Sequence, residues 1–198
     1  VVDLKQERGR EVLYRLVSTA DVLLTNMRLK ALKRLSMDYD SLVKVRPDII
    51  YARASGNGPK GPDADHGSMD ILGQARSGIM MSQAGADGRP RAANGGIADH
   101  IGAVTLAFGV MAALLHRERT GEGQQVDSSL MGGMMSAQSF QITDALFNGN
   151  KPGFWAPNDS IRPVRPTWNT YQGSDGVWFS LAMNNDSYWP GVVSLLDK

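Results

Sequence analysis

The segment "GGIADHIGAV", residues 95–104, places an acid and a histidine between a glycine pair and a long apolar run. On the local sequence, two interpretations of Asp99 stay open. Aspartate ahead of an apolar helix is a preferred N-cap residue, which would give Asp99 a structural role. The same position suits a nucleophilic carboxylate, because a helix N-terminus favours negative charge and the glycines let a ligand approach the backbone. His100 forms no dyad with Asp99 by adjacency alone, since successive helical side chains point about 100° apart.

The motif "GNGPKG", residues 56–61, matches the glycine pattern of dinucleotide-binding loops and follows an expected strand. That function requires a helix to begin at the third glycine, and Pro59 and Pro62 disfavour a continuous helix there. A rigid turn that lines another ligand, or a simple turn, fits better. The chain has three dispersed histidines without a metal-ligand spacing, and it has no cysteine. We therefore expect no metal site and no thiolate chemistry.

The composition of the 198-residue chain, 42% hydrophobic and 21% charged, is typical of a globular protein with a sizeable core. The formal net charge is +1 and the basic residues are scattered, so we expect no nucleic-acid partner. The longest apolar stretch, residues 101–115, is shorter than the roughly 20 residues that cross a bilayer, which predicts a buried helix and no membrane association. No secretory pattern opens the chain, so we expect a cytoplasmic protein. Because the first residue is not methionine, we also expect a fragment of a longer protein.

Helical spacing and short apolar runs alternate through the first half of the chain. Such alternation is typical of a parallel sheet covered by helices. We expect strands over residues 20–26 and 47–55, and helices over residues 7–19, 29–45 with a break at 36–40, and 68–76.

The second half begins with a strongly apolar helix, residues 98–118, that ends at the charged segment "HRERTGEG". We then expect a strand over 124–130, a helix over 131–147, a connection over 148–166 and a hairpin over 170–183 that turns at 174–176. Two sets of large apolar side chains are expected to fill the core: Met131, Met134 and Met135, and the aromatic residues Trp155, Trp168 and Tyr171, for which an acyl pocket is the alternative.

Several of these segments, in the same order, resemble the class III coenzyme A transferases. This family includes formyl-CoA and carnitine-CoA transferases and, as a branch, the 2-methylacyl-CoA racemases. The resemblance covers almost the whole chain, and the block that ends in "HRERTGEGQ" is its most specific part. The other matching segments are "VLLTNMRLK", where Met27 and Leu29 replace the family's Phe and Pro, "PDIIYARASGNGPKGP", "MDILGQARSG" and "NTYQGSDGVW".

The resemblance implies that Asp99 is the catalytic nucleophile. It also implies a coenzyme A site in which Asn26 and the residues Ala54, Ser55 and Gly56 flank the nucleotide. Arg34 would lie near the phosphates, and Arg28 suits the same role, because a guanidinium offers several fixed donors to phosphate oxygens.

Two positions separate this chain from the racemase branch. Asp70 matches an acid near the pantetheine, and in the racemases a histidine directly before that acid exchanges a proton. This chain has Met69 there, which the resemblance places with Asp70 at the coenzyme A site but which cannot exchange a proton. The glutamate that supports the racemase histidine is matched by Asn185. Both differences weigh against racemisation.

The implied reaction transfers coenzyme A from an acyl-CoA donor to a carboxylic acid acceptor, through aspartyl-anhydride and aspartyl-CoA thioester intermediates on Asp99. Coenzyme A and acyl-CoA would be substrates, with no permanently bound cofactor. A 2-methylacyl-CoA racemase or epimerase is the first alternative, and a non-catalytic CoA-binding fragment is the second.

The resemblance also predicts the architecture: an α/β fold with a partial Rossmann-like parallel sheet, a long helical linker and the start of a second, smaller α/β domain. Residues 1–120 would be the remainder of a large CoA-binding domain that includes the catalytic aspartate. Residues 121–166 would be helix and linker, and residues 167–198 the start of the small domain. Full-length members form an interlocked homodimer, and we expect the same of the whole protein.

Overall fold

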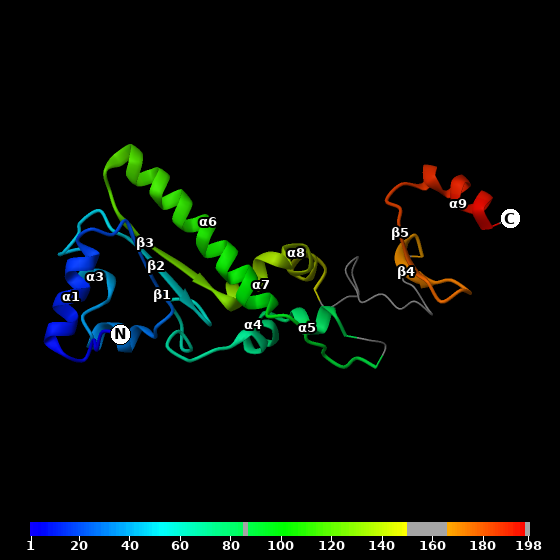
Figure 1. Cartoon of the computed structure of the whole chain (residues 1–198). Helices are drawn as coiled ribbons and strands as arrows, with labels where there is room; N and C mark the ends of the chain where they lie inside the picture. The colour runs from blue at the N-terminus through cyan, green and yellow to red at the C-terminus, as the bar shows by residue number, and fades with distance from the viewer. Residues whose placement is uncertain (85–86, 150–165, 197–198) are drawn as a thin grey trace. The chain divides into compact units, whose positions relative to one another are not determined.

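The computed structural model describes residues 1–84, 87–149 and 166–196, and Figure 1 shows the course of the chain. The chain divides into two compact units, one of Val1–Met80 with Ala92–Thr143 and one of Met81–Arg91 with Asp144–Lys198. A three-stranded sheet organises the first unit and a two-stranded sheet the second. The domain boundaries expected from the sequence stay predictions.

The sheet of the first unit consists of β1 (Val22–Thr25), β2 (Ile50–Ser55) and β3 (Gln124–Ser129), all parallel, with β2 in the centre. The first four residues of β2 are buried, as is typical of a parallel strand covered by helices on both faces. The α/β fold class with a partial parallel sheet is therefore confirmed.

One face of this sheet packs against α1 (Glu7–Val17) and α3 (Tyr39–Leu42), which lie side by side in Figure 1. The break expected at 36–40 is confirmed: the segment forms two short helices, α2 (Leu29–Arg34) and α3, and Ser36 between them adopts a left-handed φ of 55°. The buried cluster on this face is formed by Val17, Leu42, Ile49 and Tyr51.

The long helix α6 (Ile97–Thr120) packs against β2 and β3. Small buried residues, among them Gly102 and Ala113, let the helix approach the sheet closely. The expectation of a buried helix over 101–115 is correct for this face only, since an apolar stripe on α6 is exposed: Val104, Phe108, Met111 and Leu115. The most apolar 18-residue window of α6 has a mean hydropathy of 1.7, so by length and composition alone the helix could cross a membrane, a test that core helices pass as well.

Two pairs of short helices flank α6 in the sequence: α4 (Asp70–Ser77) with α5 (Ile79–Ser82) before it, and α7 (Leu130–Ala137) with α8 (Ser139–Asn148) after it. The single helix expected over 131–147 is wrong. The helix is interrupted at Gln138, whose buried side chain donates to the Ser77 carbonyl at the end of α4 over 2.6 Å. Met134 is buried as expected, whereas Met135 is exposed.

The second unit contains the hairpin of β4 (Trp168–Gln172) and β5 (Trp178–Ala182), followed by the 3₁₀ helix η1 (Asp186–Tyr188) and α9 (Trp189–Leu196). The hairpin and its turn at 174–176 are confirmed. Tyr171 packs against Phe179 with ring centroids 5.9 Å apart, but Trp168 is exposed, so its assignment to the core is wrong. Trp155 lies outside the described residues.

Candidate active site

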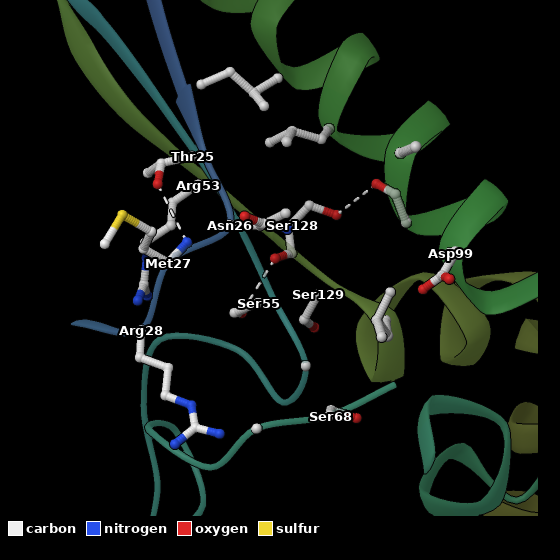
Figure 2. Close-up of a pocket in the computed structure, with 18 of the residues that line it drawn as sticks. Thr25, Asn26, Met27, Arg28, Arg53, Ser55, Ser68, Asp99, Ser128 and Ser129 are labelled. Carbon is white, nitrogen blue, oxygen red and sulfur yellow. Dashed lines mark hydrogen bonds between the residues drawn. The ribbon is translucent and has the colours of Figure 1, made fainter. Parts of the chain in front are cut away.

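A cavity of about 740 Å³ lies at the carboxyl ends of all three parallel strands (Figure 2). In open parallel sheets, ligands bind at this end, because the loops that follow the strands there carry varied side chains. The residues that line the cavity at the strand ends are Thr25 and the following Asn26 at β1, Ser55 and the following Gly56 at β2, and Ser128 and Ser129 at β3.

Asp99 reaches the same cavity from the first turn of α6. In Figure 2 the Asp99 carboxylate and the Arg28 guanidinium lie at opposite sides of the lining, with Ser128 and Ser129 between them. The cavity therefore has an anionic and a cationic side. The structure brings six of the sequence-predicted site residues together here: Asn26, Arg28, Ala54, Ser55, Gly56 and Asp99.

Serine side chains join the walls of this cavity. Ser55 Oγ donates to the Ser128 carbonyl over 3.2 Å, which connects β2 to β3. Ser128 Oγ donates to the Gly102 carbonyl over 3.1 Å, which connects β3 to α6. Ser129 Oγ accepts from the backbone N–H of Gly132 and caps α7. These bonds hold the strand ends and the Asp99 helix in one framework.

Asp99 is not the N-cap of its helix. Gly96 occupies the N-cap with a φ of 68°, a conformation that glycine adopts without strain, and it offers no capping side chain. The cap comes from another helix, since Asp70 Oδ1 accepts the backbone N–H groups of Ala98 at 2.7 Å and Asp99 at 3.2 Å. The N-cap interpretation of Asp99 was therefore wrong. His100 Nδ1 bonds the Gly96 carbonyl over 2.8 Å.

The Asp70 carboxylate is held in its ionised form. Burial raises its pKa, but hydrogen bonds from Gln74 and from the backbone of Asp99 and Ala98, together with the nearby His100, outweigh burial, so the pKa of Asp70 lies below its usual range. A carboxylate with these donors is a stronger cap than a neutral group. Asp70 thus stabilises the start of the helix that carries Asp99.

On the opposite side of the cavity, Arg28 packs against Gly67. A Cβ atom on Gly67 would overlap Arg28 Nη2, so only glycine fits with the guanidinium in this position. His66, which also lines the cavity, is exposed, and its Nδ1 lies 3.0 Å from the Asp63 carboxylate. Residues 56–61 form a bent loop, as the prolines indicate, and no helix begins there.

Sequence reasoning missed an ion pair at this cavity. Arg53, which lines it, donates through Nε to Asp127 Oδ1 over 2.8 Å, and the two side chains are 2% and 18% exposed. They are register partners on β2 and β3. The signal in the sequence is one charge in each of two otherwise uncharged strands, "IIYARAS" and "QQVDSS".

Three predicted site residues do not line the Asp99 cavity. Arg34 borders a separate cavity of about 390 Å³ with Lys5 and Arg10. Met69 is 76% exposed at the N-cap of α4, and Asp70 faces the start of α6. The predicted contacts of these three residues with coenzyme A stay predictions. Within the described ranges, no group of three His, Asp or Glu side chains is placed to hold a metal ion.

Comparison with known proteins places this geometry in a family. The family model described as CoA-transferase family III matches residues 1–198. The succinate–glutarate CoA-transferase of Agrobacterium fabrum is 34% identical over 99% of this chain, and the acetyl-CoA:oxalate CoA-transferase of Acetobacter aceti is 39% identical over 99%. The human alpha-methylacyl-CoA racemase is 33% identical over 98%.

The chain spans about half the length of these relatives, 48% to 50%. A crystal structure of a CAIB/BAIF family protein from Brucella suis matches 99% of this chain and 51% of its own with a TM-score of 0.82 and 31% identity. The match of the family model to the entire chain and the shared fold lead to one conclusion: the chain belongs to CoA-transferase family III.

Proposed function

We propose that the protein transfers coenzyme A from an acyl-CoA donor to a carboxylic acid acceptor, with Asp99 as the nucleophile. One observation carries this proposal: the Asp99 carboxylate lines the same cavity as the carboxyl ends of all three parallel strands, in a chain of CoA-transferase family III. Coenzyme A enters as a substrate, and the chemistry requires no permanently bound cofactor.

In the first half-reaction, an Asp99 carboxylate oxygen attacks the thioester carbonyl carbon. The carbon–sulfur bond breaks, coenzyme A leaves as the thiolate, and a mixed anhydride remains on Asp99. The thiolate then attacks the aspartyl carbonyl carbon and expels the donor acid as a carboxylate, which leaves an aspartyl-CoA thioester. No proton must be removed from the nucleophile, since a carboxylate attacks in its ionised form.

In the second half-reaction, the acceptor carboxylate attacks the aspartyl thioester and releases the thiolate, which forms a second mixed anhydride. The thiolate attacks the acceptor's carbonyl carbon, so the new acyl-CoA forms and the Asp99 carboxylate is restored. Each step develops an oxyanion, which requires hydrogen-bond donors beside the reacting carbon. We propose the backbone N–H groups of Gly95 and Gly96 for this role, because Gly96 lies beside the Asp99 carboxylate, where an added Cβ would be 4.0 Å from Asp99 Oδ2.

Arg28 is proposed to bind phosphate groups of coenzyme A, with Asn26 and the backbone of residues 54–56 beside the nucleotide. The position of Arg28 on the side of the cavity opposite Asp99 supports this assignment, because the reactive thioester and the phosphates are at opposite ends of the coenzyme.

The test uses the complete protein that carries this chain, with acetyl-CoA and oxalate, and succinyl-CoA and glutarate, as probe pairs. After incubation with donor and hydroxylamine, mass spectrometry is expected to find the modification on Asp99. Asp99→Ala is expected to lose both modification and transfer, while Asp40→Asn, a change at an exposed acid of α3, retains both. Transfer at the wild-type rate in Asp99→Ala would contradict the proposal.

Racemisation is the second candidate, supported by the human racemase among the relatives. Exposed Met69 stands where that reaction would need a proton-exchanging group. In deuterated water, a racemase labels the α-carbon of an enantiopure 2-methylacyl-CoA, and we expect no label. A protein that binds coenzyme A without transfer, label or Asp99 modification would be a non-catalytic binding module.

A further inference from the structure

Gln74 on α4 has a buried side chain whose polar atoms are all engaged. It is 1% exposed. Its Nε2 donates to Asp70 Oδ2 over 2.7 Å and to the Ala93 carbonyl over 3.0 Å. Its Oε1 accepts the backbone N–H of Ala93 over 2.9 Å. The side chain therefore binds both backbone groups of Ala93 in the way a neighbouring strand would, while it also orients Asp70.

These contacts hold the segment that leads to Asp99 at both ends. The segment runs from Ala93 through Gly95 and Gly96, whose φ values are 87° and 68°, into the first turn of α6. Gln74 fixes its beginning, and Asp70 fixes its end through the N–H of Asp99. The glycines between have no side chains, and the His100 contact to the Gly96 carbonyl comes from within α6 itself. The attachment of the segment to the rest of the unit therefore depends on the two α4 residues.

We propose that Gln74 is a positioning residue for the nucleophile: it holds the Asp70 carboxylate and Ala93 together, and thereby sets the position of the Asp99 backbone at the cavity. This inference rests on the proposed function of Asp99. Gln74 acts through Asp70 and Ala93, and it does not line the cavity itself.

The chemistry requires an amide at this position. In Gln74→Glu, a carboxylate replaces the donor that faces Asp70 Oδ2 and the Ala93 carbonyl, which produces repulsion of like charges. Protonation of that carboxyl or of Asp70 restores one donor, so the defect is expected to weaken as the pH falls. His100 on α6 is the other titratable group that acts on Asp70, and because it is also present in the wild type and in Gln138→Glu, comparison with their pH profiles accounts for its contribution. Gln74→Met keeps an unbranched side chain but loses all three hydrogen bonds at every pH.

A matched control exists at the other end of α4. Gln138 is also buried, at 4% exposure, and its Nε2 donates to the Ser77 carbonyl. Gln138→Glu therefore removes a buried amide donor next to the same helix without contact to Asp70 or Ala93. A general loss of stability is expected in both glutamate variants, and a local effect on residues 93–99 only in the Gln74 variants.

The first readout is amide hydrogen exchange of the complete protein without ligand. In Gln74→Met, exchange of the peptide over residues 92–100 is expected to rise on the order of tenfold relative to the rest of the domain. Equal changes over the whole domain, or the same pattern in Gln138→Glu, would overturn the proposal. This readout needs no substrate and is decisive even if the function proposed for Asp99 fails.

The second readout is turnover with the acetyl-CoA and oxalate pair. For Gln74→Glu at pH 8 we expect kcat to fall about 10- to 100-fold with little change in KM for acetyl-CoA, and to recover as the pH is lowered to 6. A pH profile parallel to that of Gln138→Glu would count against positioning. The Asp99→Ala result separately reports on the proposed function, so the two failures are distinguishable.

Discussion

Asp70 Oδ1 accepts the backbone N–H of Asp99 over 3.2 Å, so a carboxylate on α4 caps the helix that presents the proposed nucleophile. The sequence alone allows Asp99 to be both the helix cap and the nucleophile, whereas this contact assigns the cap to Asp70. Asp70 satisfies the amides of the first turn, and the side chain of Asp99 faces the cavity. The reactivity proposed for Asp99 therefore depends on how α4 packs against α6.

Removal of the Asp70 cap is expected to destabilise the protein in a pH-dependent way. Asp70→Ala leaves two amides without an acceptor and should lower the free energy of unfolding by about 1 kcal/mol at pH 7. The folded-state pKa of Asp70 lies below its usual 3.8, so the stabilisation is fully present above that pH and is lost as the pH falls further. Urea unfolding of wild type and variant between pH 7 and pH 2 measures both effects.

The expected result is a stability difference that narrows below about pH 4, because the protonated acid retains only a weaker acceptor. Asp40→Asn is the control, and its curve should run parallel to that of the wild type. A difference between Asp70→Ala and wild type that widens as the pH falls would show that the Asp70 carboxylate is not stabilised by this cap.

The local sequence pattern predicted the strands and the long helix that carries Asp99 near its start, because these depend on short apolar runs and on the placement of glycines. The same pattern did not predict contacts between residues that are distant in sequence. Asp70 lies 29 residues before Asp99, and Gln138, which interrupts the helix expected over 131–147, bonds to Ser77. Such contacts follow from how helices pack, which a linear pattern does not contain.

The Arg53–Asp127 pair illustrates the same limit for strands. Each charge is visible in the sequence, but only the register of β2 and β3 makes the two residues neighbours. Loss of Arg53 leaves the Asp127 carboxylate with the Gln125 amide as a hydrogen-bond donor but without an opposite charge, so Arg53→Met is expected to lower the free energy of unfolding by about 3 kcal/mol. Chemical denaturation of the single and double variants with Asp127→Leu measures this cost.

In that double-mutant cycle, the double variant is expected to be more stable than the sum of the single effects predicts, since it removes both charges together. The exposed pair Arg91 and Asp87, 3.5 Å apart, provides the comparison and should show a coupling close to zero. Additive effects at Arg53 and Asp127 would mean that the pair contributes no interaction of its own.

Tyr51 should limit stability in alkali. Burial raises the pKa of its phenol to about 12, and its hydroxyl donates to the Met37 carbonyl over 2.8 Å. Because the folded-state pKa is raised from 10, the contribution of Tyr51 is present below pH 10 and is lost as the pH rises toward 12. Unfolding curves of the wild type, recorded between pH 10 and pH 12 together with phenolate absorbance, are expected to show a falling free energy of unfolding.

Tyr51→Phe removes that pH dependence but leaves the Met37 carbonyl without its donor, at a cost of about 1–3 kcal/mol at neutral pH. Tyr188→Phe, at an exposed tyrosine, is expected to retain the wild-type dependence on pH. The interpretation would fail if Tyr51→Phe lost stability above pH 10 as steeply as the wild type does.

The contact between Gly67 and Arg28 predicts that a substitution at Gly67 weakens coenzyme A binding without a change in the fold. In Gly67→Ala the new Cβ meets the far end of the Arg28 side chain, which is flexible, so the guanidinium moves and the backbone does not have to. We expect the free energy of unfolding to change by less than about 0.5 kcal/mol. If Arg28 binds a coenzyme A phosphate, its displacement should weaken binding about tenfold, which calorimetry with coenzyme A measures.

The mechanism requires that Gly67→Ala act through Arg28 alone. Arg28→Ala should therefore weaken coenzyme A binding by at least as much, and Gly67→Ala added to it should have little further effect, because the side chain it displaces is gone. Gly191→Ala, where a Cβ meets no atom within 4 Å, is the control and should bind as wild type does. A tenfold loss from Gly67→Ala that persists in the Arg28→Ala background would instead assign the effect to the loop itself, and coenzyme A phosphate recognition would then have to be sought in other cations of the chain.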